Sequence, residues 1–521
     1  MVPPVSVDRF FTRRPNAGTV PLHVLEPEEA KRFLAAHETY QRWAKANDFS
    51  PKPGRTLSLP GADGTIAGVL VVRPEDASPF GLGDLPARLP KGRYAVEGCT
   101  DVAALEALAL GWALGQYELE RYRKRRRVPR TLVWPAGVDT DRVTQLAEAT
   151  YLVRDLINTP AEDMGPDALE AAARVVAERH GAAIEVTVGD DLLEAGYPAV
   201  HAVGRAAAVA PRLIDLRWGP EDAAKVTLVG KGVCFDTGGL DLKTADGMSL
   251  MKKDMGGGAH VLALASLVMQ RNLPVRLRML LPAVENSVAG NAMRPSDILQ
   301  TRKGITVEVG NTDAEGRLIL ADALAEAATE TPELILDYAT LTGAARVALG
   351  SDVPALFASD DTLAQGLLQG GDRVHDPLWR MPLVEDYDRY LEGSISDIKN
   401  IGGGRYGGAI VAALFLRRFV GKTIPWAHID VMAFNRETRP GRPKGGEAMG
   451  LRAALAMLEE RYVAGDRPKK AATKKAPAKK AASKKAPAKK TASKKAPAKK
   501  AATKKAARKA PAKKKASRKK R

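Results

Sequence analysis

The run NTDAEGRLIL at residues 311–320 indicates both the fold of this chain and the place of its chemistry. Residues 305–309 just before it alternate in apolarity, as a strand does, and a helical apolar spacing follows it. Asp313, Glu315 and Arg317 alternate with other residues in the connection between strand and helix. Carboxylates and a guanidinium at a strand's carboxyl end are costly to gather unless they bind something. Oxygen ligands beside a fixed cation predict divalent metals and an anionic intermediate at this loop.

The alternation of strand and helix extends over most of the chain beyond about residue 166. Strands are predicted at residues 184–188, 226–229, 275–281, 305–309, 334–336 and 427–431. Helices are predicted at residues 167–180, 259–270, 318–328 and 409–419. This order predicts an α/β fold whose mixed, largely parallel sheet is covered by helices. In such folds the chemistry lies outside the carboxyl ends of the strands.

Changes in composition divide the chain into four parts. We expect a smaller N-terminal α/β domain at residues 1–140, with a strand at residues 69–72 and a helix at residues 102–122. The remaining parts are a linking helix and turn at residues 141–165, a catalytic domain at residues 166–464 and a disordered basic tail at residues 465–521.

The net charge of +19 is the sum of two parts of the chain that carry opposite net charges. Residues 467–521 hold 26 Lys and Arg and no Asp or Glu, which leaves 54 basic and 61 acidic residues in residues 1–466. The body is therefore acidic, with a net charge of −7. A strongly basic tail on an acidic body calls for a separate explanation of each.

The cysteines and the apolar runs indicate the cellular compartment in which the protein is expected. Cys99 and Cys234 are far apart and form no Cys-x-x-Cys pair, which fits a reducing compartment. The N-terminus has no apolar segment of the signal-peptide kind, and the longest apolar run, near residues 261–269, is too short to span a bilayer. We expect a cytoplasmic protein without a membrane partner.

Two more segments carry candidate ligands. VGKGVCFDTGGLDLK at residues 229–243 and SLMKKDMGGGA at residues 249–259 supply Lys231, Asp236, Lys243 and Asp254. With Asp313 and Glu315 these make four carboxylates, which cannot all stay ionised together without cations. Two divalent ions would neutralise them and hold a bridging hydroxide. One lysine could serve as a neutral nitrogen ligand with a lowered pKa, and another could stabilise an oxyanion.

Other interpretations of these segments are weaker. A phosphate-binding Walker loop needs glycine at position 225 and Ser or Thr after the lysine, whereas this chain has Lys225 and Gly232. Glycines 256–258 could cradle a phosphate, but a close-packed helix start is favoured. His260 and His428 are expected to be structural. A two-metal phosphoesterase remains an alternative, although such sites usually add histidines.

Taken together, the segments closely resemble the leucyl (cytosol) aminopeptidase family, whose signature is NTDAEGRL. Further matches are RDLINTP (residues 154–160), YATLTGA (338–344), GGAIVAALFL (407–416) and WAHIDV (426–431). The resemblance covers roughly residues 150–462 well, the N-terminal region only by position, and the tail not at all. It implies a metal-dependent exopeptidase that removes N-terminal residues, leucine-like ones preferred, and usually forms a homohexamer.

The resemblance also implies a role for each site residue. Asp236 and Glu315 would bridge two divalent metal ions, for which manganese or zinc is expected. Lys231 and Asp254 would complete the tighter site, and Asp313 the more exchangeable one. Lys243 would polarise the scissile carbonyl and stabilise the gem-diolate, and Arg317 would hold a bicarbonate that acts as general base. The pocket for the N-terminal side chain would be lined by Met251, Thr340, Gly343 and Ala433. The segment VMAFN at residues 431–435 departs from the small-residue stretch common in the family, which puts side-chain preference in question.

The tail repeats a KKAxx unit every five residues. Its Lys-Lys-Ala-Pro-Ala pattern resembles linker-histone-like tails and predicts non-specific, salt-dependent binding of DNA or RNA and an association with the nucleoid. Representative lysines are Lys474, Lys475, Lys484, Lys485, Lys494 and Lys495. The alternatives are a solvated extension that aids solubility, and a nucleoid-associated protein that uses the peptidase fold only as an oligomeric scaffold.

Overall fold

A computed structural model describes residues 6–125, 127–402 and 404–463 of the chain. Within these ranges the strands form a six-stranded sheet, a nine-stranded sheet and two small sheets. The tail predicted at residues 465–521 lies outside the described residues. In the ranges that are described, no helix combines the length and apolarity needed to cross a membrane.

The six-stranded sheet belongs to the N-terminal part of the chain and has the order β1-β6-β5-β2-β4-β3. Its neighbouring strands run parallel except β3 and β4, which are antiparallel. The strands are β1 (Phe11–Thr12), β2 (Thr19–Leu25), β3 (Thr56–Pro60), β4 (Ile66–Val72), β5 (Arg93–Glu97) and β6 (Thr131–Val133). The helices are α1 (Pro27–Ala36), α2 (Glu38–Ala46), α3 (Leu85–Arg88) and α4 (Val102–Leu114).

Helix α4 is shorter than the apolar pattern of residues 102–122 predicts, because it ends at Leu114. Gly115 follows, and a Cβ built there would lie 1.6 Å from the carbonyl oxygen of Gly83. This close backbone approach requires glycine, and apolar residues beyond it, such as Tyr117 and Leu119, pack on the core outside a helix.

The nine-stranded sheet has the order β16-β15-β18-β14-β9-β11-β8-β7, with β10 paired to β11. Strands β18, β14, β9, β11 and β10 run parallel, while β8, β7 and β15 bring antiparallel pairs. The strands are β7 (Ala183–Val188), β8 (Arg212–Trp218), β9 (Ala224–Gly230), β10 (Gly232–Asp236), β11 (Val275–Asn286), β14 (Leu334–Ala339), β15 (Ala355–Ala358), β16 (Trp379–Arg380) and β18 (Trp426–Asp430). A mixed sheet with a parallel centre agrees with the fold class predicted from the sequence.

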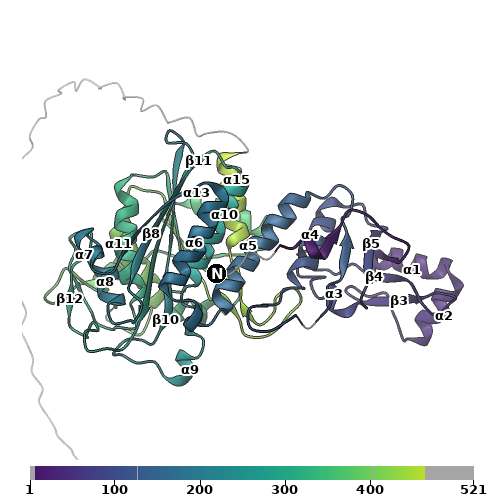
Figure 1. The fold of residues 1–521 in the computed structure, drawn as a ribbon, viewed down its shortest axis with the longest axis horizontal. Helices are drawn as coiled ribbons and strands as arrows, with labels where there is room; N and C mark the ends of the chain where they lie inside the picture. The colour runs from purple at the N-terminus through teal and green to yellow at the C-terminus, as the bar shows by residue number, and fades with distance from the viewer. Residues whose placement is uncertain (1–5, 126, 403, 464–521) are drawn as a thin grey trace, which may run out of the picture. The chain divides into compact units, whose positions relative to one another are not determined.

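Helices cover both faces of this sheet. Adjacent residues of a strand point to opposite faces, and accordingly Leu228 and Val229 belong to two different apolar clusters. One face carries α5 (Thr140–Asn158), α6 (Pro166–His180), α10 (Gly256–Gln270), α13 (Asp361–Arg373) and α15 (Leu451–Tyr462). The other carries α8 (Pro198–Gly204), α11 (Gly316–Thr329) and α14 (Gly408–Val420). Figure 1 shows α6 and α10 on one side of the strands and α8 and α11 on the other.

The strand predicted before the NTDAEGR run is much shorter than expected and lies outside the main sheet. It is β13 (Val307–Glu308), which pairs with β12 (Ile298–Leu299) and β17 (Ile398–Lys399) in a separate three-stranded sheet. Val307 and Val309 are buried in the apolar cluster beneath α11, so the alternating pattern is satisfied by this side sheet. Short elements complete the described chain: α7 (Asp191–Glu194), α9 (Ala245–Met248), α12 (Gly343–Leu349), β19 (Phe434–Asn435), β20 (Gly445–Gly446) and 3-10 turns at Asp8–Phe10, Ala161–Asp163, Met251–Lys253 and Glu385–Leu391.

Candidate metal centre

The predicted ligands converge at one edge of the nine-stranded sheet. Parallel strands end at the same edge, and Lys231 directly follows β9 while Asp236 is the last residue of β10. Asp254 lies just before α10. Glu315 is the N-terminal cap residue of α11. Strand ends and helix starts therefore bring together residues that are far apart in sequence.

The first half of the site centres on Lys231, which is almost completely buried. Its Nζ lies 2.7 Å from Oδ2 of Asp254 and 2.8 Å from Oε1 of Glu315. Lys231 also donates a hydrogen bond to the carbonyl of Thr340 at 3.2 Å. A Cβ built on Gly316 would lie 2.4 Å from Cε of Lys231, so glycine at the start of α11 makes room for the lysine.

The second half centres on Lys243. Its Nζ lies 2.8 Å from Oδ2 of Asp236 and forms an ion pair with Oδ1 of Asp313. Asp236 is buried, whereas the side chain of Asp313 is 34% exposed. The two halves thus differ in access to solvent, although each pairs one lysine with two carboxylates.

Carboxylate oxygens from both halves lie close enough to share a metal ion. Ligand atoms of Asp236, Asp313 and Glu315 all lie within 4.8 Å of one another. Oδ2 of Asp254 and Oε1 of Glu315 are buried, and each is ion-paired with Nζ of Lys231 but receives no well-aligned hydrogen bond from the described residues. Buried carboxylate oxygens in this condition fit hard divalent cations.

Burial and neighbouring charges shift the pKa values of the clustered side chains. Burial, followed by the charge of Asp236, raises the pKa of Glu315 well above its ordinary value, and burial with the charge of Asp254 raises that of Asp236. Burial would also raise the pKa of Asp254, but Lys231 lowers it below the ordinary value. Without metal ions the pKa of Lys231 is raised: burial acts downward, but the charges of Asp254, Glu315 and Asp236 outweigh it. A neutral Lys231 therefore requires cations on these carboxylates.

Arg317 lies in the first turn of α11 and is buried. Its Nη1 donates to the carbonyl of Asn400 at 2.6 Å, while its Nε has no partner among the described residues. Burial lowers its pKa to about 10, against the opposing charge of Glu315. A buried guanidinium with an unpaired donor suits a small anion.

Two of the residues expected to line a side-chain pocket, Thr340 and Ala433, lie beside the start of α10. Oγ1 of Thr340 donates to Oδ1 of Asp254 at 2.7 Å. A Cβ built on Gly256 would lie 2.6 Å from Cβ of Ala433 and 3.1 Å from Cγ2 of Thr340, so these two residues flank the glycine. Met251 begins the 3-10 turn that leads to Asp254, and Gly343 begins α12.

Glycines 256–258 form a close-packed helix start, as favoured from the sequence. A Cβ on Gly257 would lie 2.1 Å from the carbonyl oxygen of Tyr338. His260 is also structural, since its Nδ1 lies 2.6 Å from the carbonyl of Gly256 and its Nε2 accepts from the amide of Met449 at 2.9 Å. His428 is buried with its Nδ1 2.5 Å from Oδ1 of Asp337.

Sequence reasoning missed three residues that support the ligands. Asn286, the last residue of β11, donates to Oδ1 of Asp236 at 2.9 Å and to the carbonyl of Thr312 at 3.1 Å. Asn400 donates from Nδ2 to the carbonyl of Asn311 at 2.7 Å. Asp430 accepts from the amide of Leu341 at 3.0 Å. Asp430 lies within the predicted strand at residues 427–431, as a polar residue near its end. Asn286 was missed because β11 continues to Asn286, beyond the predicted end at residue 281. Asn400 has no comparable signal.

Comparison with known proteins agrees with this geometry. Residues 151–455 match the cytosol aminopeptidase family, catalytic domain, and residues 20–135 match the M17 aminopeptidase N-terminal domain. A probable cytosol aminopeptidase of Stenotrophomonas maltophilia is 38% identical over 455 residues, covering 81% of this chain and 92% of that protein.

Solved structures show the same relationship. The crystal structure of cytosol aminopeptidase from Coxiella burnetii is 47% identical, covers 87% of this chain and 99% of its own, and superposes with a TM-score of 0.83. The bottromycin maturation enzyme BotP in complex with Mn is 34% identical, covers 85% and 99%, and has a TM-score of 0.75. The chain therefore belongs to the cytosol aminopeptidase family, whose members are metal-dependent exopeptidases.

Proposed function

We propose that this enzyme removes N-terminal, leucine-like residues from peptides with water activated by two divalent metal ions. The observation that carries the proposal is the convergence of four carboxylates and two lysines at one sheet edge. Lys231, Asp236, Asp254, Asp313 and Glu315 would hold the metals. When bound, such ions supply a nucleophilic hydroxide and polarise the substrate carbonyl. Manganese is a reasonable first choice because BotP, a relative, was solved with Mn.

Two basic residues of the protein, Lys243 and Arg317, would stabilise negative charge during the reaction. Burial acts to lower the pKa of Lys243, but Asp236 and Asp313 raise it, so this side chain is a protonated donor. It is placed to stabilise negative charge that develops on the substrate carbonyl oxygen. Arg317 would hold a small anion, such as bicarbonate, that accepts a proton from the attacking water. Met251, Thr340 and Gly343, with Ala433, would receive the N-terminal side chain.

The test is hydrolysis of leucine p-nitroanilide by the purified full chain with added manganese. We expect turnover that a chelator abolishes and manganese restores, and that Asp254→Asn removes. Asp222→Asn, on an exposed turn before β9, is the matched control and should leave turnover unchanged. Chelator-resistant turnover would contradict the proposal. Faster hydrolysis of p-nitrophenyl phosphate than of the amide would favour the phosphoesterase alternative.

We also propose a homohexameric assembly. Val347 and Tyr406 are each 90% exposed in the single chain, and large apolar side chains this open are suited to burial by another subunit. Light scattering of the full chain should give six times the monomer mass. A monomer at assay concentrations would contradict this.

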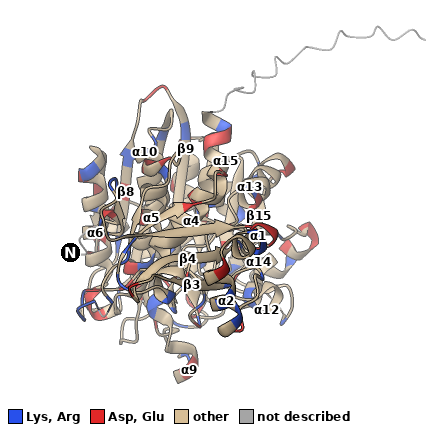
Figure 2. Ribbon diagram, turned by 90° about the vertical axis from the view of Figure 1, so that its right-hand side faces the viewer, with Lys and Arg blue, Asp and Glu red and all other residues tan. Residues whose placement is uncertain are grey.

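A second candidate function, binding of nucleic acid, rests on the 26 basic and no acidic residues of residues 467–521. Basic and acidic residues are interspersed over the described body, so the one-sided charge belongs to the tail sequence (Figure 2). Lysines such as Lys474, Lys475, Lys484, Lys485, Lys494 and Lys495 would neutralise phosphates of DNA or RNA without reading bases. The full chain should retard duplex DNA at low salt, and a chain ended at residue 465 should not, while keeping peptidase activity. Equal retardation by both would contradict the tail as the binding element. A cytoplasmic, nucleoid-associated location would follow from this binding.

A further inference from the structure

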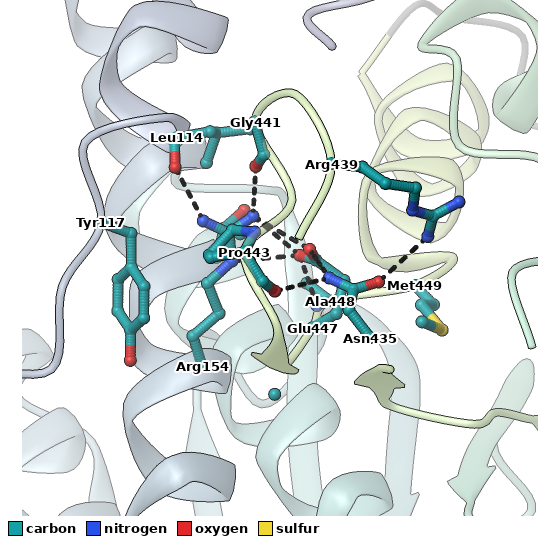
Figure 3. A network of polar contacts seen from close by, with 12 residues as sticks. Leu114, Tyr117, Arg154, Asn435, Arg439, Gly441, Pro443, Glu447, Ala448 and Met449 are labelled. Atoms are coloured by element: carbon teal, nitrogen blue, oxygen red, sulfur yellow. Dashed lines mark hydrogen bonds and ion pairs between the residues drawn. The ribbon is translucent and has the colours of Figure 1, made fainter. Parts of the chain in front are cut away.

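The last turns of α5 carry two side chains that the chemistry above does not use. Arg154 is fully buried, and its guanidinium contacts the carboxylate of Glu447 through Nε at 3.1 Å and Nη2 at 3.0 Å. It also donates to the carbonyls of Leu114 at 3.0 Å and Gly441 at 2.7 Å. Figure 3 shows this guanidinium between the two carbonyl groups and the Glu447 carboxylate.

Glu447 links Arg154 to the segment that contains Ala433. Its Oε2 accepts from Nδ2 of Asn435 at 2.6 Å, and its amide donates to the carbonyl of Ala433 at 3.1 Å. Ala433 has a φ of +56°, a left-handed conformation that a non-glycine residue adopts only when its surroundings impose it. The Glu447 contacts hold this wall of the pocket, where Ala433 lies against Gly256.

Asn158, one turn after Arg154, contacts both walls. Its Oδ1 accepts from the amide of Gly446 at 2.8 Å, next to Glu447. Its carbonyl accepts from Nζ of Lys252 at 2.6 Å, and Lys252 directly follows Met251, another member of the proposed pocket. One helix end therefore holds the Ala433 segment and the Met251 segment at a set separation.

We propose that Arg154 and Asn158 are positioning residues that set the width of the pocket for the substrate's N-terminal side chain. The proposal rests on the proposed aminopeptidase function and on the pocket being formed by Met251 and Ala433. A bidentate guanidinium–carboxylate pair fixes direction as well as distance, so it can hold one geometry of the strand pair β19–β20, which Ala433 and Glu447 flank. Loss of these contacts lets the Ala433 wall move and changes which side chains fit.

The experiment compares kcat and KM for p-nitroanilides of leucine, phenylalanine and alanine in manganese-loaded, full-length Arg154→Lys and Asn158→Ala. Lysine keeps the charge of Arg154 but loses the bidentate contact. We expect the leucine-to-phenylalanine ratio of kcat/KM to change about tenfold, the size of effect that pocket fit produces, mainly through KM. Arg142→Lys is the control, because Arg142 lies on the same helix and pairs with Glu459 at 2.8 Å.

A merely structural role lowers the amount of active enzyme, and so reduces kcat equally for every substrate. Equal loss for the three substrates, with KM and the ratios unchanged, would overturn the positioning role and leave the aminopeptidase function intact. Asn158→Ala decides the matter if Arg154→Lys does not fold, because it removes only the side-chain contacts to Gly446 and Tyr117. Absence of amide hydrolysis by the wild-type enzyme would instead overturn the function on which the proposal rests.

Discussion

The Lys231 cluster and the Lys243 cluster use the same chemistry in different environments. Side chains of Lys231, Asp254 and Glu315 are 4%, 4% and 1% exposed. Those of Lys243 and Asp313 are 14% and 34% exposed. Buried charges must be compensated by neighbours, because water cannot screen them, whereas partly exposed charges can exchange partners. The buried half is suited to permanent metal binding, and the open half to an exchangeable ion and to contact with substrate.

The strongest test of this contrast is Glu315→Gln in the buried half. The change leaves Lys231 with fewer carboxylates and removes the proposed bridge between the metals. We expect kcat/KM for leucine p-nitroanilide to fall about 10⁴-fold, with loss of bound metal measured by mass spectrometry. Glu221→Gln, an exposed change before β9, serves as control. A variant that keeps both metals and full turnover would remove the distinction between the halves.

Lys243→Met tests the open half. Since Lys243 is proposed to stabilise charge on the substrate, and not to hold metal, kcat should fall about 10²- to 10³-fold while metal content is unchanged. Lys231→Met should instead lose metal. Steady-state kinetics with metal analysis separates the two lysines. Parallel loss of metal in both variants would show that the clusters do not divide their roles.

Sequence patterns predicted the parallel centre of the sheet and the convergence of the ligands because strand ends and helix starts are local features. Lys231, Asp236 and Glu315 were all placed in this way. The place of β13 could not be predicted from the sequence. A two-residue strand in the separate three-stranded sheet gives the same alternation of apolar residues as a strand of the nine-stranded sheet. Asn400 supports the site through contacts to residues 89 positions away, for which no local pattern exists.

The surroundings of Arg154 illustrate the same limit. Its motif, RDLINTP, is a local pattern, but its partners Leu114 and Glu447 lie 40 and 293 positions away in the sequence. Leu114 can accept this hydrogen bond because α4 ends there, and the apolar pattern of residues 102–122 hid that helix end. Only the folded chain shows that Arg154 of this local run joins segments that are distant in the sequence.

Asp313→Asn should produce the smallest effect and gives the sharpest comparison within the site. Asp313 lies in the open half, and its backbone carbonyl survives the substitution. One of two manganese equivalents should bind at least about tenfold more weakly, while the other, held near Lys231, keeps its affinity. Calorimetric titration of the metal-free enzyme resolves the two equivalents, and excess manganese should restore most of the turnover. If both equivalents weaken together, the ions share all their ligands, and the difference in exposure between the clusters has no consequence for metal binding.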